Sequence, residues 1–245
     1  MAPHFQSDDP IVEALFLGTS RRRGAGRCIA RRLYRRLASR RGSGARPRCR
    51  VVLALDIARF TSRDEATQIH LRAVMYRIVD EALAAARIGR RGSRLEDRGD
   101  GLLMVLRAQA SLDTVLPALF GNIREGVQDH NATAVPSARL RLRAALHAGF
   151  LHHDRYGVAG DTVNLLFRML DAPAMKRRLD DEDADFALAV SPNVYEAATG
   201  YRLIDGKDFE LIEVDVKQTR ASAWLYLAPP PGPARHGSPP TRVAG

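Results

Sequence analysis

The chain has 245 residues, of which 45% are hydrophobic, so it is long and apolar enough for one domain with a sizeable core. No run of about 18 apolar residues occurs, which excludes a membrane-spanning helix, and the arginines near the N-terminus are not followed by the apolar stretch of a secretory signal. We therefore expect a cytoplasmic protein. The two cysteines, Cys28 and Cys49, are spaced neither as a zinc knuckle nor as a disulfide scaffold.

The formal net charge of +10 is confined to one end of the chain. Residues 1–50 hold 13 arginines and three acidic residues, whereas the rest of the chain is balanced. We expect residues 1–47 to form a basic, solvated and disordered arm. The alternatives are an arm that binds an acidic partner, either nucleic acid or a membrane surface, through phosphate groups, and an over-extended translation start. Residues 228–245 are rich in Pro and Gly and predict a flexible tail.

The first predicted elements are a strand and a helix. Residues 50–56, RVVLALD, form a short apolar run that predicts a buried strand with Asp56 at the edge of the sheet. Ser62 and Glu65 have the spacing of a capping box and predict a helix start. An apolar stripe then recurs at helical spacing and comprises Leu71, Val74, Met75, Ile78, Val79 and Ala82.

Residues 94–106, RLEDRGDGLLMVL, predict a β-hairpin. A short strand runs through Leu95, a turn covers residues 98–101, and a strand of branched and long apolar side chains follows. Asp100 lies at the tip of this hairpin. In such a turn an Asp is by default only a turn former, but beside a second carboxylate it is also a candidate metal ligand.

The second half of the chain alternates between helical and extended patterns. Helices are predicted over about 112–130, over 161–172 after Gly160, and over 191–199 from a Ser191-Pro192 cap. Strands are predicted over 140–150, 186–190, 201–205, 209–216 and 222–227. The order of strand, helix, hairpin, helix and strand is that of an α+β ferredoxin-like sandwich, with helices packed on one face of a sheet.

This fold class has a consequence for the two aspartates. In a ferredoxin-like sheet the first strand and the hairpin are neighbours, so we expect Asp56 and Asp100 to converge at one edge. Paired carboxylates beside backbone carbonyls form a site for hard cations, and two Mg²⁺ ions held in this way suit phosphoryl transfer.

Three patches of the sequence carry a family resemblance. They read LALDIARFT at 53–61, LEDRGDGLLMV at 95–105 and RYGVAGDTVNLLFRM at 155–169. In this order they resemble the motifs F-x-D-I-x-G-F-T, E/K-x-x-G-D and R-Y-x-x-x-G-D-T-V-N-x-x-x-R-M of the class III nucleotidyl cyclases, the adenylate and guanylate cyclases, in a divergent bacterial form. The resemblance covers residues 48–227 and implies one cyclase-type catalytic domain.

The resemblance also implies roles for individual residues. Asp56 and Asp100 would hold two Mg²⁺ or Mn²⁺ ions with the help of the carbonyl of Ile57. Asn164 and Arg168, one helical turn apart, would be the catalytic pair that steadies the ribose and the transition-state phosphate.

Further positions of the resemblance imply substrate contacts. Phe60 and Thr61 belong to the phosphate-facing loop, and Lys217 stands about where the family has a lysine for the terminal phosphates. Glu96 stands where the family reads the base, with Lys in adenylate cyclases and Glu in guanylate cyclases. A carboxylate accepts from guanine N1–H and N2–H₂, so GTP is expected first. Gly157 offers no side chain at the second base-reading position, so a pyrimidine triphosphate is expected second.

The implied reaction is attack of the 3′-hydroxyl of a nucleoside triphosphate on its own α-phosphorus, with pyrophosphate as the leaving group. The implied assembly is a homodimer with composite sites, in which one subunit supplies the metal aspartates and the other the base-reading and Asn/Arg groups. Three features depart from the family: Arg59 replaces a Gly, residues 149–156 form a shortened hairpin, and residues 165–167 are bulky. The alternative is a catalytically inactive cyclase-like domain that binds nucleotide or acts as a regulator.

Overall fold

The computed structural model describes residues 46–89, 93–106 and 112–228. The expected basic arm over residues 1–47 and the expected tail over residues 228–245 lie almost entirely outside the described residues. Their boundaries and their partners therefore stay predictions.

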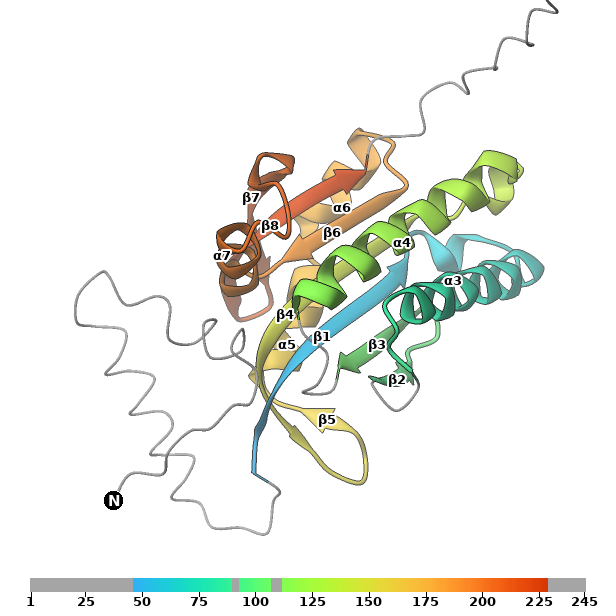
Figure 1. Cartoon of the computed structure of the whole chain (residues 1–245). Helices are drawn as coiled ribbons and strands as arrows, with labels where there is room; N and C mark the ends of the chain where they lie inside the picture. The colour runs from blue at the N-terminus through green and yellow to red at the C-terminus, as the bar shows by residue number, and fades with distance from the viewer. Residues whose placement is uncertain (1–45, 90–92, 107–111, 229–245) are drawn as a thin grey trace, which may run out of the picture.

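A mixed β-sheet forms the centre of the described residues (Figure 1). Its strands run in the order β2-β3-β1-β4-β6-β8-β7, and β5 pairs with β4 off this path. β4 and β6 are parallel, and the other neighbouring strands are antiparallel. The strands are β1 (Arg48–Ile57), β2 (Ser93–Asp97), β3 (Gly101–Leu106), β4 (Leu142–His153), β5 (Val158–Ala159), β6 (Phe186–Val190), β7 (Phe209–Val216) and β8 (Thr219–Ala228).

Helices cover both faces of this sheet, not one face as expected. α3 (Glu65–Ala85), α4 (Leu112–Thr133) and α7 (Pro192–Gly200) pack on the face that carries Leu53 and Leu55 of β1. α5 (Asp161–Leu170) and α6 (Pro173–Asp181) pack on the opposite face, behind the sheet in Figure 1. The expectation of one helical face is wrong because successive residues of β1 are buried on alternate sides, as in a central strand.

α6 was not predicted because its sequence, PAMKRRLDD, is mostly polar. Only Met175 and Leu179, four residues apart on one helical face, are buried. The short 3₁₀ helices are η1 (Phe60–Ser62), η2 (Pro136–Ala138) and η3 (Gly206–Asp208).

Two local predictions are corrected by the structure. Asp64, not Ser62, caps α3, because the Asp64 side chain accepts a hydrogen bond from the Thr67 amide while the Ser62 hydroxyl donates to the Arg59 carbonyl. Residues 201–205 form no strand. The amide of Leu203 donates back to Ala198, and Arg202 adopts a left-handed conformation, so this segment closes the C-terminus of α7.

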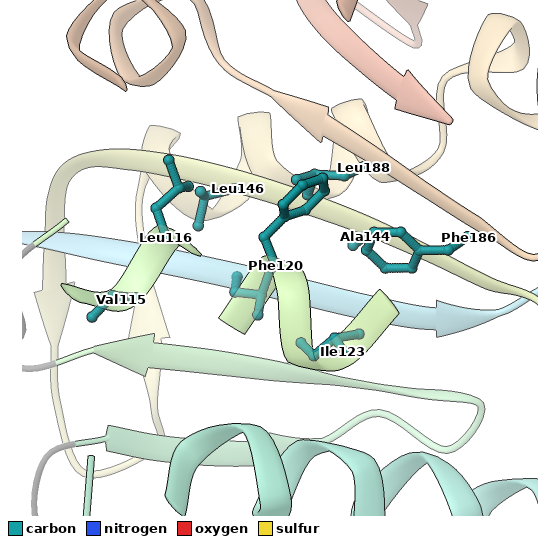
Figure 2. Close-up of a pocket in the computed structure, with 9 residues that line it drawn as sticks. Val115, Leu116, Phe120, Ile123, Ala144, Leu146, Phe186 and Leu188 are labelled. Carbon is teal, nitrogen blue, oxygen red and sulfur yellow. The ribbon is translucent and has the colours of Figure 1, made fainter. Parts of the chain in front are cut away.

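The apolar stripe of α3 and the β3 strand are buried as predicted. A small cavity of about 20 Å³ remains between α4 and the sheet (Figure 2). Its walls are entirely apolar, so it offers no hydrogen-bond partner to a water or a polar ligand. They comprise Leu53, Val115, Leu116, Phe120, Ile123, Ala144, Leu146, Phe186 and Leu188. Among the described helices, none is long and apolar enough to cross a membrane.

Candidate active site

The pairing of β1 with β3 brings Asp56 and Asp100 to one edge of the sheet. Asp56 lies opposite Gly101, and the amide of Ile57 donates a hydrogen bond of 2.9 Å to the carbonyl of Asp100. Glycine is needed at position 101, because a Cβ there would lie well inside van der Waals contact with the Leu55 carbonyl oxygen. The local sequence G-D-G therefore sets how closely the hairpin tip approaches the end of β1.

Arg143 is a member of this edge that the sequence did not reveal. It lies opposite Asp56 in the β1–β4 pair, and its guanidinium donates to Asp56 Oδ2. The other carboxylate oxygen, Asp56 Oδ1, is buried and accepts no hydrogen bond from the described residues. Burial raises the pKa of Asp56 from 3.8 to about 6, an effect that the Arg143 charge opposes and the Asp100 charge strengthens.

These residues fit a divalent cation. A buried carboxylate oxygen without a partner is costly unless a cation or a donor completes it, and a second carboxylate lies close by at Asp100. No cluster of three or more His, Cys, Asp or Glu side chains suited to a metal occurs in the described residues. Backbone carbonyls and substrate oxygens would therefore have to complete the coordination of an ion here.

The segment that follows β1 turns away from the strand at Arg59. Arg59 is left-handed, with φ +55°, and its guanidinium lies 3.1 Å from Asp180 of α6. Phe60 and Thr61 then form η1, where Phe60 packs partly against the core and Thr61 is exposed. An open groove of about 470 Å³ adjoins η1 and the hairpin turn, lined by Phe60, Glu65, Gln68, Ile69, Arg72, Asp97 and Gly99.

α5 presents Asn164 and Arg168 on its outer side. The helix begins after Gly160, as predicted, and the Thr162 hydroxyl ties its first turn to β4 by donating 2.7 Å to the Phe150 carbonyl. Asn164 is exposed and Arg168 is half-buried. Neither side chain makes a hydrogen bond or an ion pair within the part of the chain that the structure describes. The Arg168 guanidinium is therefore available to an anion.

The two expected base-reading positions face each other. A Cβ added at Gly157 would lie 3.2 Å from Glu96 Oε1. Gly157, with φ +144°, is held in the loop between β4 and β5, where the Asp154 carboxylate accepts from the amides of Tyr156 and Gly157. Strand β2 and this loop thus meet at Glu96.

Glu96 lies between two arginines to which the family resemblance assigns no role. Arg94 Nε is 3.0 Å from Glu96 Oε1, and Arg98 donates 3.0 Å to Glu96 Oε2. The Glu96 side chain is only 18% exposed. The sequence carries a pattern that could have indicated these contacts. Residues 94, 96 and 98 alternate along the chain, so in an extended segment their side chains project from the same side.

Lys217 does not join the other residues. It is exposed in the turn between β7 and β8. The strand registers put Asp56 level with Arg143, Ala187 and Leu227, at the far end of β8 from this turn. Within one chain, Asp56 and Lys217 therefore lie at opposite ends of the sheet.

No protein-family model matches the sequence, and no curated protein is similar to it. The fold, by contrast, is similar to solved cyclase structures. The guanylyl cyclase Cya2 aligns with a TM-score of 0.53 at 16% identity, over 78% of this chain and 98% of that one. An adenylate/guanylate cyclase/hydrolase from Silicibacter pomeroyi gives 0.53 at 19% identity, over 75% and 98%. A bacterial light-regulated adenylyl cyclase gives 0.50 at 12%, over 74% and 90%. The described residues therefore have the α+β fold of nucleotidyl cyclase catalytic domains, as the resemblance implied.

Proposed function

We propose that this chain, which has the fold of nucleotidyl cyclase catalytic domains, is a nucleotidyl cyclase that converts a nucleoside triphosphate into a 3′,5′-cyclic nucleotide and pyrophosphate. One observation carries the proposal. Asp56 and Asp100 meet at one sheet edge, and Asp56 Oδ1 is buried without a hydrogen bond from the described residues. A structural aspartate would have its oxygens satisfied, whereas a metal ligand leaves one oxygen for the ion.

Asp56 and Asp100 would hold two Mg²⁺ or Mn²⁺ ions together with the carbonyl of Ile57. The ions, when bound, supply the charge that lowers the pKa of the 3′-hydroxyl and neutralises the leaving pyrophosphate. Arg143 keeps a donor on Asp56 Oδ2 and so orients the carboxylate. Burial of Asp56 strengthens its attraction to a cation, because the interaction is less screened than in water.

Asn164 and Arg168 would act on the substrate. The Arg168 guanidinium can donate two parallel hydrogen bonds to phosphoryl oxygens and stabilise charge that develops in the transition state. Asn164, one turn earlier on the same side of α5, can hold the ribose. Phe60 and Thr61 would border the triphosphate in η1.

Glu96 would select the base. Its carboxylate accepts hydrogen bonds and donates none, so it favours a base with N–H groups on its Watson–Crick edge. GTP is therefore our first substrate and a pyrimidine triphosphate our second, because Gly157 adds no second reader.

The proposed assembly is a homodimer with composite sites. Asp56 and Lys217 lie at opposite ends of the sheet in one chain, so a lysine for the terminal phosphates has to come from a second copy. The same copy would supply Glu96, Asn164 and Arg168.

Two ion pairs favour the alternative, a non-catalytic nucleotide-binding or regulatory domain. The guanidinium of Arg143 already neutralises Asp56, and Arg59 of the expected phosphate loop is directed to Asp180 instead. The Arg143 cation would oppose binding of a further positive ion at Asp56 unless it shifts, and Arg59 would have to leave Asp180 to reach a phosphate.

The test is an incubation of the purified protein with ATP, GTP, CTP and UTP, each with Mg²⁺ or Mn²⁺, followed by mass spectrometry for cyclic nucleotide. We expect product from the wild type and none from Asp56→Asn or Asp100→Asn. Arg77→Ala is the matched control, because Arg77 is an exposed arginine whose ion pair in the described part of the chain is with Glu81 on the same helix. A wild type that binds triphosphates but forms no product would support the non-catalytic alternative.

A further inference from the structure

Arg98 is held in a place where it can contact a bound base. Its guanidinium donates 3.0 Å to Glu96 Oε2, and its Cζ lies 5.3 Å from the centroid of the Phe167 ring in α5. The side chain is still 43% exposed. Arg98 therefore lies between a carboxylate and an aromatic ring while some of its N–H groups face solvent.

The backbone of Arg98 is also fixed. Its amide donates 2.9 Å to the Gly101 carbonyl across the hairpin turn. The Asp97 carboxylate accepts from the Gly99 amide at 2.8 Å and from Arg72 of α3. The turn that carries Arg98 is thus tied both to β3 and to α3, so its side chain starts from a defined position.

The position opposite Glu96 has no side chain, because it is occupied by Gly157. Gly157 faces Glu96 but contributes none, whereas Phe167 on α5 is large and lies under Arg98. Two side chains that can donate to a base lie 3.0 Å from the Glu96 carboxylate, Arg94 and Arg98. The Arg94 guanidinium is already engaged on a second side, because its Nη1 contacts His153 Nε2 at 2.7 Å.

We propose that Arg98, held on Phe167, is a specificity-determining residue that donates to a carbonyl oxygen of the base while Glu96 accepts from the adjacent N–H. The inference rests on the proposed function and names its substrate class. The site accepts triphosphates whose base carries N–H beside C=O, which are GTP and UTP, and rejects ATP and CTP.

The chemistry of the four bases gives this division. Guanine presents N1–H beside O6, and uracil presents N3–H beside O4. Adenine presents an unprotonated N1 beside an amine, and cytosine an unprotonated N3 beside an amine. With the ring nitrogen against Glu96 and the exocyclic group against Arg98, these two bases set acceptor against acceptor and donor against donor. Groups that the bound base covers without a hydrogen bond are penalised.

The experiment compares Arg98→Ala, Arg98→Lys and Phe167→Leu with the wild type. Two quantities are measured: kcat/KM for the four triphosphates, and the dissociation constants of their 3′-deoxy analogues, which cannot cyclise. The control is Arg94→Ala, which removes the other arginine beside Glu96 but not the group on Phe167.

We expect Arg98→Ala to lower the GTP-to-ATP and UTP-to-CTP ratios by at least about tenfold in both measurements. Arg98→Lys should restore only part of the loss, because an ammonium has no planar fork to stack and donate in parallel. Phe167→Leu should reduce the ratios and Arg94→Ala should leave them unchanged.

Unchanged ratios in Arg98→Ala, or an equal loss in Arg94→Ala, would overturn the assignment of Arg98 while cyclase activity still stands. A wild type that prefers ATP or CTP would do the same. A wild type that neither binds nor cyclises any triphosphate would overturn both this inference and the proposed function.

Discussion

Replacing Gly101 by alanine tests the strand register that brings Asp56 and Asp100 together. Gly101 lies opposite Asp56 in the β1–β3 pair. A Cβ there would lie inside van der Waals contact with the Leu55 carbonyl oxygen, and 3.1 Å from both the Leu55 carbonyl carbon and Asp56 Cα. These are backbone atoms of a strand that pairs on both sides, so they cannot move without disturbing two ladders.

The expected cost follows from that contact. Overpacking in a protein core costs about 1–3 kcal/mol, and a clash with backbone falls at the upper end, so we expect about 3 kcal/mol for Gly101→Ala. In a domain of this size a loss of about 1 kcal/mol lowers Tm by roughly 2–4 °C. The Tm of Gly101→Ala should therefore lie roughly 6–12 °C below that of the wild type.

Two other glycines serve as controls in the same thermal and urea unfolding experiments. Gly99 has φ +85° and no atom within 4 Å of an added Cβ, so Gly99→Ala should cost only the left-handed strain of about 1 kcal/mol. Gly121 lies in α4 with equally open space, and Gly121→Ala should stabilise the protein by about 0.5–1 kcal/mol. If Gly101→Ala unfolds no more easily than Gly99→Ala, the register between β1 and β3 is wrong.

Three further predictions concern pH, base choice and assembly. Burial lowers the pKa of His147 from 6.5 to about 4, so the unfolded chain binds the proton more readily than the folded one. The free energy of unfolding should therefore fall by about 3 kcal/mol as the pH falls from above about 6.5 to below about 4. His147→Asn should remove that loss in urea unfolding at several pH values; parallel curves for the two proteins would contradict the assignment. Glu96→Lys should shift turnover toward ATP or abolish it, because the lysine donates where Glu96 accepts and also faces Arg94 and Arg98. An unaltered preference among the triphosphates would show that Glu96 pairs with these arginines and does not read the base. Asp56→Ala and Arg168→Ala, each inactive alone, should regain cyclic nucleotide formation when mixed, as composite sites require; no recovery under conditions that exchange subunits would argue against a shared site.

Local sequence signals predicted the strands and the helices that have strong periodicity. The β1 run, the G-D-G hairpin and the stripe of α3 are encoded by residues near one another in the chain, so the pattern of each could be interpreted alone. The same holds for the start of α5 after Gly160. α6 could not be predicted in this way, because only two of its side chains are apolar and buried. The pattern of residues 201–205 predicts a strand, whereas the segment caps α7, because that cap depends on left-handed backbone at Arg202, which the pattern does not encode.

The sequence by itself therefore determined the class of fold, the order of its strongly periodic elements and the acids that meet at the end of β1. Only the tertiary structure decided that helices cover both faces of the sheet, that Arg143 contacts Asp56, and that Glu96 lies between Arg94 and Arg98 opposite Gly157. The reason is physical. Secondary structure follows from the spacing of apolar side chains along a few turns, whereas a contact between residues such as Asp56 and Arg143, 87 positions apart, follows from the register of a sheet that many strands set together.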